Sequence, residues 1–147
     1  MSVPSPEVGT PTPVPPEVPS HLQDEYAEGD RDPRTDIFTA ARPWGEFRQF
    51  VSNETVTVKI ITVAPGHRLS LQRHSQRGEL WQVLDVPLDV QVGDRRYVAQ
   101  QGETVWVPPG AMHRLGNSGE QTGRVLEVAF GLFDEEDIER FEDDYAR

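Results

Sequence analysis

The stretch PGHRLSLQRHSQRGELWQV, residues 65–83, carries the strongest structural signal in the sequence. Two short β-rich runs lie on either side of a polar turn, which predicts two consecutive strands. Gln72 and His74 are two residues apart on the first run, so their side chains should point to the same face. Glu79 begins the second run, just after the turn. All three offer the nitrogen or oxygen atoms that hold divalent metals.

A second stretch, GETVWVPPGAMHRLGN (residues 102–117), supplies a fourth candidate ligand. Its Pro-Pro-Gly turn separates two further β-rich runs, and His113 follows the turn. A lone His on a strand is more often structural than a metal ligand. Here, however, two of the 4 His residues of the chain fall in these two stretches. Joint placement therefore predicts one metal site with four ligands: Gln72, His74, Glu79 and His113.

Similar runs continue on both sides, with Gly, Pro and Asn turns between them. This spacing predicts an all-β sandwich or barrel with a single core. The predicted strands are VTVKIITV (56–63), RLSLQRH (68–74), ELWQVLDV (79–86), LDVQV (88–92), RRYVA (95–99), TVWVP (104–108), MHRL (112–115) and RVLEVAF (124–130).

The two ends of the chain have a different composition. Residues 1–35 contain eight of the 13 prolines, which predicts a disordered Pro-rich arm before a domain spanning residues 36–147. The last 14 residues, 134–147, are highly acidic. Asp134 is a candidate cap for a short helix, because Ile138, Phe141 and Tyr145 follow at helical spacing and would pack on the barrel. We therefore expect either a short C-terminal helix or a solvated tail.

Composition excludes several classes of function. The chain has no Cys, so a thiolate nucleophile is absent and any metal must be held by His, carboxylate or amide groups. The net charge of −11 argues against nucleic acid and anionic membranes as partners. No apolar run approaches the ~20 residues that cross a bilayer, and the N-terminus lacks the pattern of a secretory signal. We therefore expect a cytoplasmic protein.

The two stretches resemble the two motifs of the cupin superfamily. The second stretch matches at five fixed positions, Gly102, Pro108, Gly110, His113 and Asn117. The first matches at Gly66, His74 and Glu79, with Gln72 where many cupins have His and Val86 where a Gly is expected. The resemblance implies a double-stranded β-helix, the cupin jelly-roll barrel.

Gln72 narrows the resemblance to one family within the cupins. Residues 65–83 are similar to the LSLQxH…RxExW signature of type II phosphomannose isomerases, which include the C-terminal domain of bifunctional mannose-1-phosphate guanylyltransferases. The similarity extends over residues 42–147. The Gly-rich nucleotide signature of the guanylyltransferase domain is missing, so we do not expect that activity. The chain departs from the family at Ser75, Gln76 and Leu80, where the family usually has further His residues.

This resemblance implies a metal-dependent isomerase that interconverts mannose 6-phosphate and fructose 6-phosphate through an enediol. Zinc is the expected cofactor, although Mn, Fe, Co and Ni accept the same ligands. The reaction needs a Lewis acid, a base for a carbon-bound proton and a cation for the phosphate. Lys59, the single Lys of the chain, is the first candidate for substrate contact, followed by Arg77 and Arg114 as phosphate ligands and Glu127 as the base.

Two alternatives remain open from the sequence. His74, Glu79 and His113 also form the two-His-one-carboxylate set of non-haem iron(II) oxygenases. A non-catalytic cupin that binds a sugar or another small ligand is the other alternative, and the departures at Ser75, Gln76 and Leu80 favour it. The family resemblance further implies a homodimer, formed through edge strands that would otherwise be exposed.

Overall fold

The computed structural model describes residues 32–145, which fall into two compact units divided between Glu54 and Thr55. The described part of the first unit begins with a 3-10 turn, η2 (Pro33–Asp36), capped by the side chain of Asp32. A two-stranded antiparallel hairpin follows, formed by β1 (Phe38–Arg42) and β2 (Gly45–Gln49). The sequence did not predict this hairpin. Most of the predicted Pro-rich arm lies outside the described residues.

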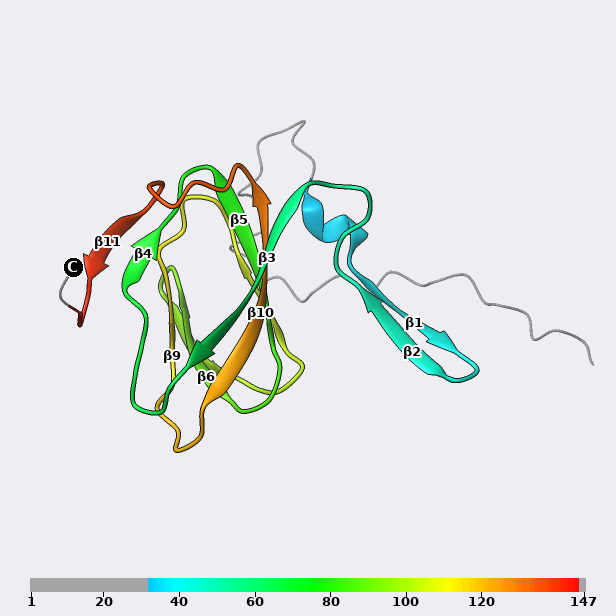
Figure 1. Ribbon diagram of the computed structural model, residues 1–147, viewed down its shortest axis with the longest axis horizontal. Helices are drawn as coiled ribbons and strands as arrows, with labels where there is room; N and C mark the ends of the chain where they lie inside the picture. Colours follow the sequence, from blue (N-terminus) through cyan, green and yellow to red (C-terminus); the bar gives the residue numbers. More distant parts are fainter. Residues whose placement is uncertain (1–31, 146–147) are drawn as a thin grey trace, which may run out of the picture. The chain divides into compact units, whose positions relative to one another are not determined.

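The second unit is a barrel of antiparallel strands in two sheets, and its strands wrap around a common interior (Figure 1). The four-stranded sheet has the order β3-β10-β5-β8, and the five-stranded sheet has the order β11-β4-β9-β6-β7. The strands are β3 (Val56–Val63), β4 (Leu71–Arg73), β5 (Arg77–Val83), β6 (Leu88–Val92), β7 (Arg95–Ala99), β8 (Thr104–Val107), β9 (His113–Gly116), β10 (Gly123–Gly131) and β11 (Glu139–Glu142).

Strand pairing in the barrel is nested. β3 pairs with β10, β4 with β9, β5 with β8 and β6 with β7. The chain therefore runs out along four strands and returns beside them, which is the connectivity of a jelly roll. The prediction of an all-β barrel is confirmed. Because of this nesting, residues far apart in sequence, such as Gln72 and His113, lie directly opposite each other.

The interior of the barrel changes character along its length. At one end, Val83 of β5 and Val125 of β10 lie opposite each other and are buried. Two residues further, the inward positions of the same strands are Trp81 and Glu127, and Glu79 follows on β5. Side chains of a strand alternate between faces, so these polar groups point inward like the two valines. The functional site therefore lies at the polar end of the barrel.

The C-terminal residues form a strand, and the predicted helix is wrong. β11 pairs with β4, which would otherwise be an edge strand with unsatisfied backbone groups. Phe141 and Tyr145 are 46% and 41% exposed, so their helical spacing does not mark a buried stripe. Arg114 of β9 donates to both the backbone and the side chain of Glu142 and holds the strand in place. Among the described residues, no helix is long and apolar enough to span a bilayer.

Candidate metal centre

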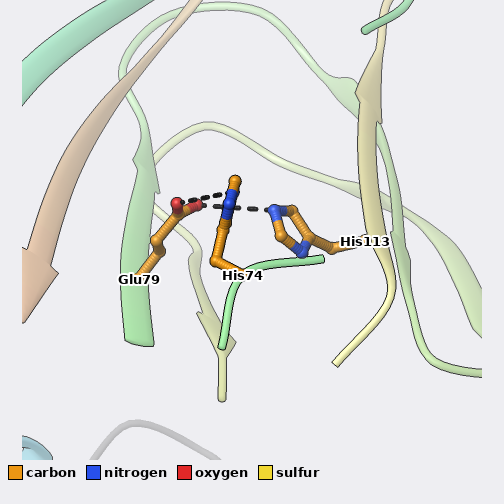
Figure 2. Close-up of side chains that lie close together, drawn as sticks. All are labelled: His74, Glu79 and His113. Carbon is orange, nitrogen blue, oxygen red and sulfur yellow. Dashed lines mark ion pairs between the residues drawn. The ribbon is translucent and has the colours of Figure 1, made fainter. Parts of the chain in front are cut away.

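Three of the four predicted ligands converge at the polar end of the barrel. Glu79 lies on β5, His113 is the first residue of β9, and His74 follows β4. Figure 2 shows both imidazole rings directed at the carboxylate of Glu79. His74 Nε2 lies 3.2 Å from Glu79 Oε1, and His113 Nε2 lies 3.7 Å from Glu79 Oε2. One ligand atom from each residue lies within 4.8 Å of the others, and all three side chains are buried.

The second ring nitrogen of each His fixes the tautomer. His74 Nδ1 lies 2.8 Å from the carbonyl oxygen of Asp137, and His113 Nδ1 lies 2.9 Å from that of Ala111. A carbonyl only accepts hydrogen bonds, so Nδ1 carries the hydrogen and Nε2 presents its lone pair to the cluster. Burial lowers the pKa of His113 to about 4 and also lowers the pKa of His74. Both rings are therefore neutral near pH 7, the form that binds metal.

The donor atoms fit a divalent cation. Among the described residues, Glu79 Oε2 and His113 Nε2 are buried atoms without a hydrogen-bond partner. Buried polar atoms are normally paired, so two unpaired acceptors facing each other need an explanation. A divalent metal would satisfy both, and two imidazoles with one carboxylate form an established donor set for zinc, iron or manganese.

Gln72, the fourth predicted ligand, lies beside this cluster. It is directly opposite His113 in the pairing of β4 with β9, so the two side chains share one face. Gln72 is half-buried, and its Oε1 accepts a hydrogen bond from the Ser70 hydroxyl at 3.1 Å. Its role as a ligand stays a prediction.

The two candidate arginines have different positions. Arg77 is buried inside the cluster, where its Nε donates to Glu79 Oε1 at 3.1 Å and its guanidinium lies 3.3 Å from His74 Nε2. Arg77 and Glu79 are two residues apart on β5 and therefore share a face. Arg114 is adjacent to His113 on β9 and points the other way, where it donates to the Leu69 carbonyl and to Glu142. The structure brings Arg77 to the site and directs Arg114 to β11.

Glu127 and Lys59 lie opposite each other on β10 and β3. Trp81, opposite Glu127 on its other side, donates from its indole nitrogen to Glu127 Oε1 at 3.1 Å. Burial, together with the negative charge of Glu79, raises the pKa of Glu127 to about 7. Lys59 is partly exposed, and its amine lies 3.1 Å from Glu135 Oε1. The site therefore contains a buried carboxyl group that can exchange a proton near neutral pH.

Asp137 supports the candidate metal ligands but was not among the predicted site residues. Its carboxylate accepts hydrogen bonds from the backbone of Ser75 and Gln76 and from the Ser75 hydroxyl, while its carbonyl holds His74. These hydrogen bonds lower the pKa of Asp137 to about 2. The sequence signal for Asp137 was that it lies within residues 42–147, the range over which the chain resembles type II phosphomannose isomerases. The acidic surroundings made it look like part of a solvated tail.

Comparison with known proteins identifies relatives. A family described as "Mannose-6-phosphate isomerase C-terminal" matches residues 29–143. The alginate biosynthesis protein AlgA of Pseudomonas aeruginosa is 38% identical over 107 residues, which cover 72% of this chain and 22% of that protein. The mannose-1-phosphate guanylyltransferase ManC of Salmonella typhimurium is 37% identical over the same length and coverage. The chain thus spans about a fifth of the length of these relatives.

Solved structures agree on the fold. CapF of Staphylococcus aureus, a capsular polysaccharide assembling protein, has a TM-score of 0.53 at 18% identity, covering 72% of this chain and 32% of CapF. A predicted oxalate decarboxylase of Thermotoga maritima has a TM-score of 0.51 at 17% identity, covering 65% of this chain and 92% of that one. At such identities the likeness concerns the fold alone. With the nested strand pairing, it confirms the cupin jelly roll.

Proposed function

The chain belongs to the mannose-6-phosphate isomerase C-terminal family, and from this premise we propose that its barrel is a metal-dependent sugar-phosphate isomerase. Mannose 6-phosphate and fructose 6-phosphate are the proposed substrate pair. The observation that carries the proposal is the placement of Glu127, a buried carboxyl with a pKa of about 7, beside the cluster of His74, Glu79 and His113. A proton-transfer group and a metal-binding set at one end of one barrel are what aldose–ketose isomerisation needs.

In this proposal His74, Glu79 and His113 hold the metal, with Gln72 as the fourth ligand and zinc as the cation. A bound divalent metal supplies Lewis-acid stabilisation for the negative charge that develops on the sugar oxygens. Asp137 and the Ala111 carbonyl keep the two imidazoles oriented by their hydrogen bonds to the distal ring nitrogens.

Glu127 is the proposed base. Its carboxylate removes the proton from C2 of the aldose, and the electron pair of that C–H bond forms the C1–C2 double bond of the enediol as O1 gains a proton. The carboxyl then returns the proton to C1 while O2 loses its own, which leaves the ketose. A pKa near 7 allows the group to accept and to donate at neutral pH. The hydrogen bond from Trp81 orients the carboxylate for both halves.

Lys59 and Arg77 are the proposed phosphate ligands. Both cations lie at the polar end of the barrel and contact the Phe133 ring, the Lys59 amine at 4.0 Å and the Arg77 guanidinium carbon at 4.2 Å from its centroid. A guanidinium can bind phosphate in bidentate fashion, and an ammonium adds a compact charge. Arg114 has no part in this proposal, because its hydrogen bonds hold β11.

The test is an assay for interconversion of mannose 6-phosphate and fructose 6-phosphate by the metal-reconstituted chain, with a chelated control. We expect chelator-sensitive turnover that Glu127→Gln reduces by about 10²–10⁴-fold in kcat with bound metal unchanged. Glu120→Gln, which removes an exposed carboxylate elsewhere, is the matched control and should have no effect. Absence of turnover with metal bound would reject the isomerase in favour of a binding protein, and oxygen consumption with iron would favour an oxygenase.

We also propose that the protein is a homodimer. Among the described strands β3 pairs only with β10, so its other edge is free, and Val58 and Ile60 on β3 are 56% and 58% exposed. A long apolar edge strand is a template for pairing with another chain. Light scattering during size-exclusion chromatography should give twice the chain mass, and a monomer at micromolar concentration would refute the proposal. The cytoplasmic location stays a prediction from the sequence.

A further inference from the structure

The segment that joins β10 to β11, residues 132–138, lies against the site and is fixed there at two points. Arg77 donates to the Asp134 carbonyl at 3.1 Å. At the far end, Asp137 holds His74 through its carbonyl and residues 75 and 76 through its carboxylate. Phe133 comes directly before the first anchor, and Glu135 comes directly after it.

Phe133 lies near both cations that the proposed function assigns to the phosphate. The Lys59 amine lies 4.0 Å from the centroid of the ring, and the Arg77 guanidinium carbon lies 4.2 Å from it. Cations within about 6 Å of an aromatic face are attracted by its quadrupole. The half-buried ring therefore helps to hold both Lys59 and Arg77 in place at the site.

Glu135 places its carboxylate beside one of these cations, Lys59. Its carboxylate lies 3.1 Å from the Lys59 amine, while its own side chain is 80% exposed. Among the described residues, the Lys59 amine contacts Glu135 and the Phe133 ring, and its charge also acts on Glu127, which lies opposite it on β10. An ion pair this exposed is screened by water and weak, so a phosphate group with two negative charges can displace it. Glu135 thus stands where a substrate anion would bind.

We propose that Phe133 and Glu135 form a gate over an anion subsite made by Lys59 and Arg77. Without substrate, the Glu135 carboxylate forms an ion pair with the Lys59 amine. A phosphate group that enters replaces this carboxylate. The backbone anchors at Asp134 and Asp137 stay in place, so the exchange moves side chains and leaves the metal ligands undisturbed. This gate rests on the proposed function for its assignment of Lys59, and it makes Glu135 a residue that sets the affinity for anionic substrates.

The test is a calorimetric titration of the full chain with inorganic phosphate. The titration is done with metal-loaded protein and with chelated protein, so that phosphate binding to the metal is distinguished from phosphate binding to Lys59 and Arg77. Removing the competing carboxylate in Glu135→Gln should tighten phosphate binding about 2- to 5-fold, the range expected for an exposed ion pair. Glu136→Gln is the matched control, since it removes the same charge from the neighbouring exposed position. That variant should bind like wild type, and Lys59→Met should bind at least about 5-fold more weakly.

Equal tightening in Glu135→Gln and Glu136→Gln would overturn the gate, because it would report only the general charge of the segment. Unchanged binding in Lys59→Met would overturn the subsite itself. Phosphate binding needs no turnover, so its outcome is separate from that of the isomerase assay. Turnover without the Glu135 effect would reject the gate alone, and the Glu135 effect without turnover would reject the isomerase alone.

Discussion

Burial of Glu127 should give the chelated protein a contribution to stability that is lost as the pH rises, and the substitution Glu127→Gln should remove this contribution. The pKa of this carboxyl rises from 4.5 to about 7 on folding, because burial and the charge of Glu79 disfavour its ionised form. The folded chain therefore binds a proton that the unfolded chain has released at any pH between these values. Stability due to Glu127 is fully present below pH 4.5 and is lost as the pH rises through 7.

The magnitude follows from the size of the shift. A difference of about 2.5 between the two pKa values, at about 1.4 kcal/mol for each unit, corresponds to about 3 kcal/mol. His113 has the opposite sign. Its pKa falls from 6.5 to about 4 on folding, so its contribution is present above pH 6.5 and is lost as the pH falls through 4. The two contributions are similar in size and offset each other between pH 4.5 and 6.5, so the lowered pKa of His74 leaves the wild-type free energy of unfolding rising with pH in this range.

The substitution Glu127→Gln removes one of these opposing contributions. Its free energy of unfolding, measured by urea denaturation with a chelator present, should rise with pH relative to wild type by about 3 kcal/mol between pH 4.5 and 7. Glu120→Gln, at an exposed position, should give a curve parallel to wild type. Parallel curves for Glu127→Gln and wild type would show that Glu127 titrates normally, and would remove the argument for it as a base at neutral pH.

Three further predictions concern the metal ligands and the architecture around them. His113→Ala should lower bound metal, measured by elemental analysis, well below one ion per chain, and full metal content would disprove the ligand assignment. Arg114→Ala should cost about 1–3 kcal/mol of stability and speed amide exchange in residues 139–142, because Arg114 is the buried donor that holds β11; unchanged exchange there would refute this role. Gly131→Ala should destabilise by at least about 2 kcal/mol in denaturant melts, because Gly131 has φ +104° and its added Cβ would overlap the Gln76 carbonyl oxygen; a wild-type melt would contradict it.

Local sequence pattern was sufficient for most of the barrel. The predicted strand over residues 56–63 has the bounds of β3, and those over 88–92 and 95–99 have the bounds of β6 and β7. Each is a short run that contains β-branched or aromatic residues and is followed by a turn with Pro or Gly, so propensity and turn chemistry agree. His74, Glu79 and His113 were predictable for a related reason. Their spacing around two turns is set by local geometry, and the nested pairing of strands then brings them together.

Long-range pairing explains what the sequence did not reveal. The acidic C-terminal residues have a helical spacing, yet they form β11, because the free edge of β4 offers backbone partners that the local sequence does not show. The inward direction of Arg77 depends on its sharing a face with Glu79, and its buried position depends on Phe133 and Asp134 from a distant segment. The same holds for Asp137, whose supporting role exists only once β10 and β11 place it beside His74.

Burial gives the histidines and the Glu127 carboxyl of the site their different chemistry. Removal from water disfavours charge, so the same enclosed space lowers the pKa of His113 and raises that of Glu127. The neutral imidazole keeps a lone pair available for a metal, and the carboxyl keeps a proton that it can release near pH 7. At an exposed rim both groups would return toward their ordinary pKa values, and Glu127 would be too weak a base to serve the proposed isomerase. The polar end of this barrel interior therefore determines which chemistry the site can support, because burial there sets both protonation states at once.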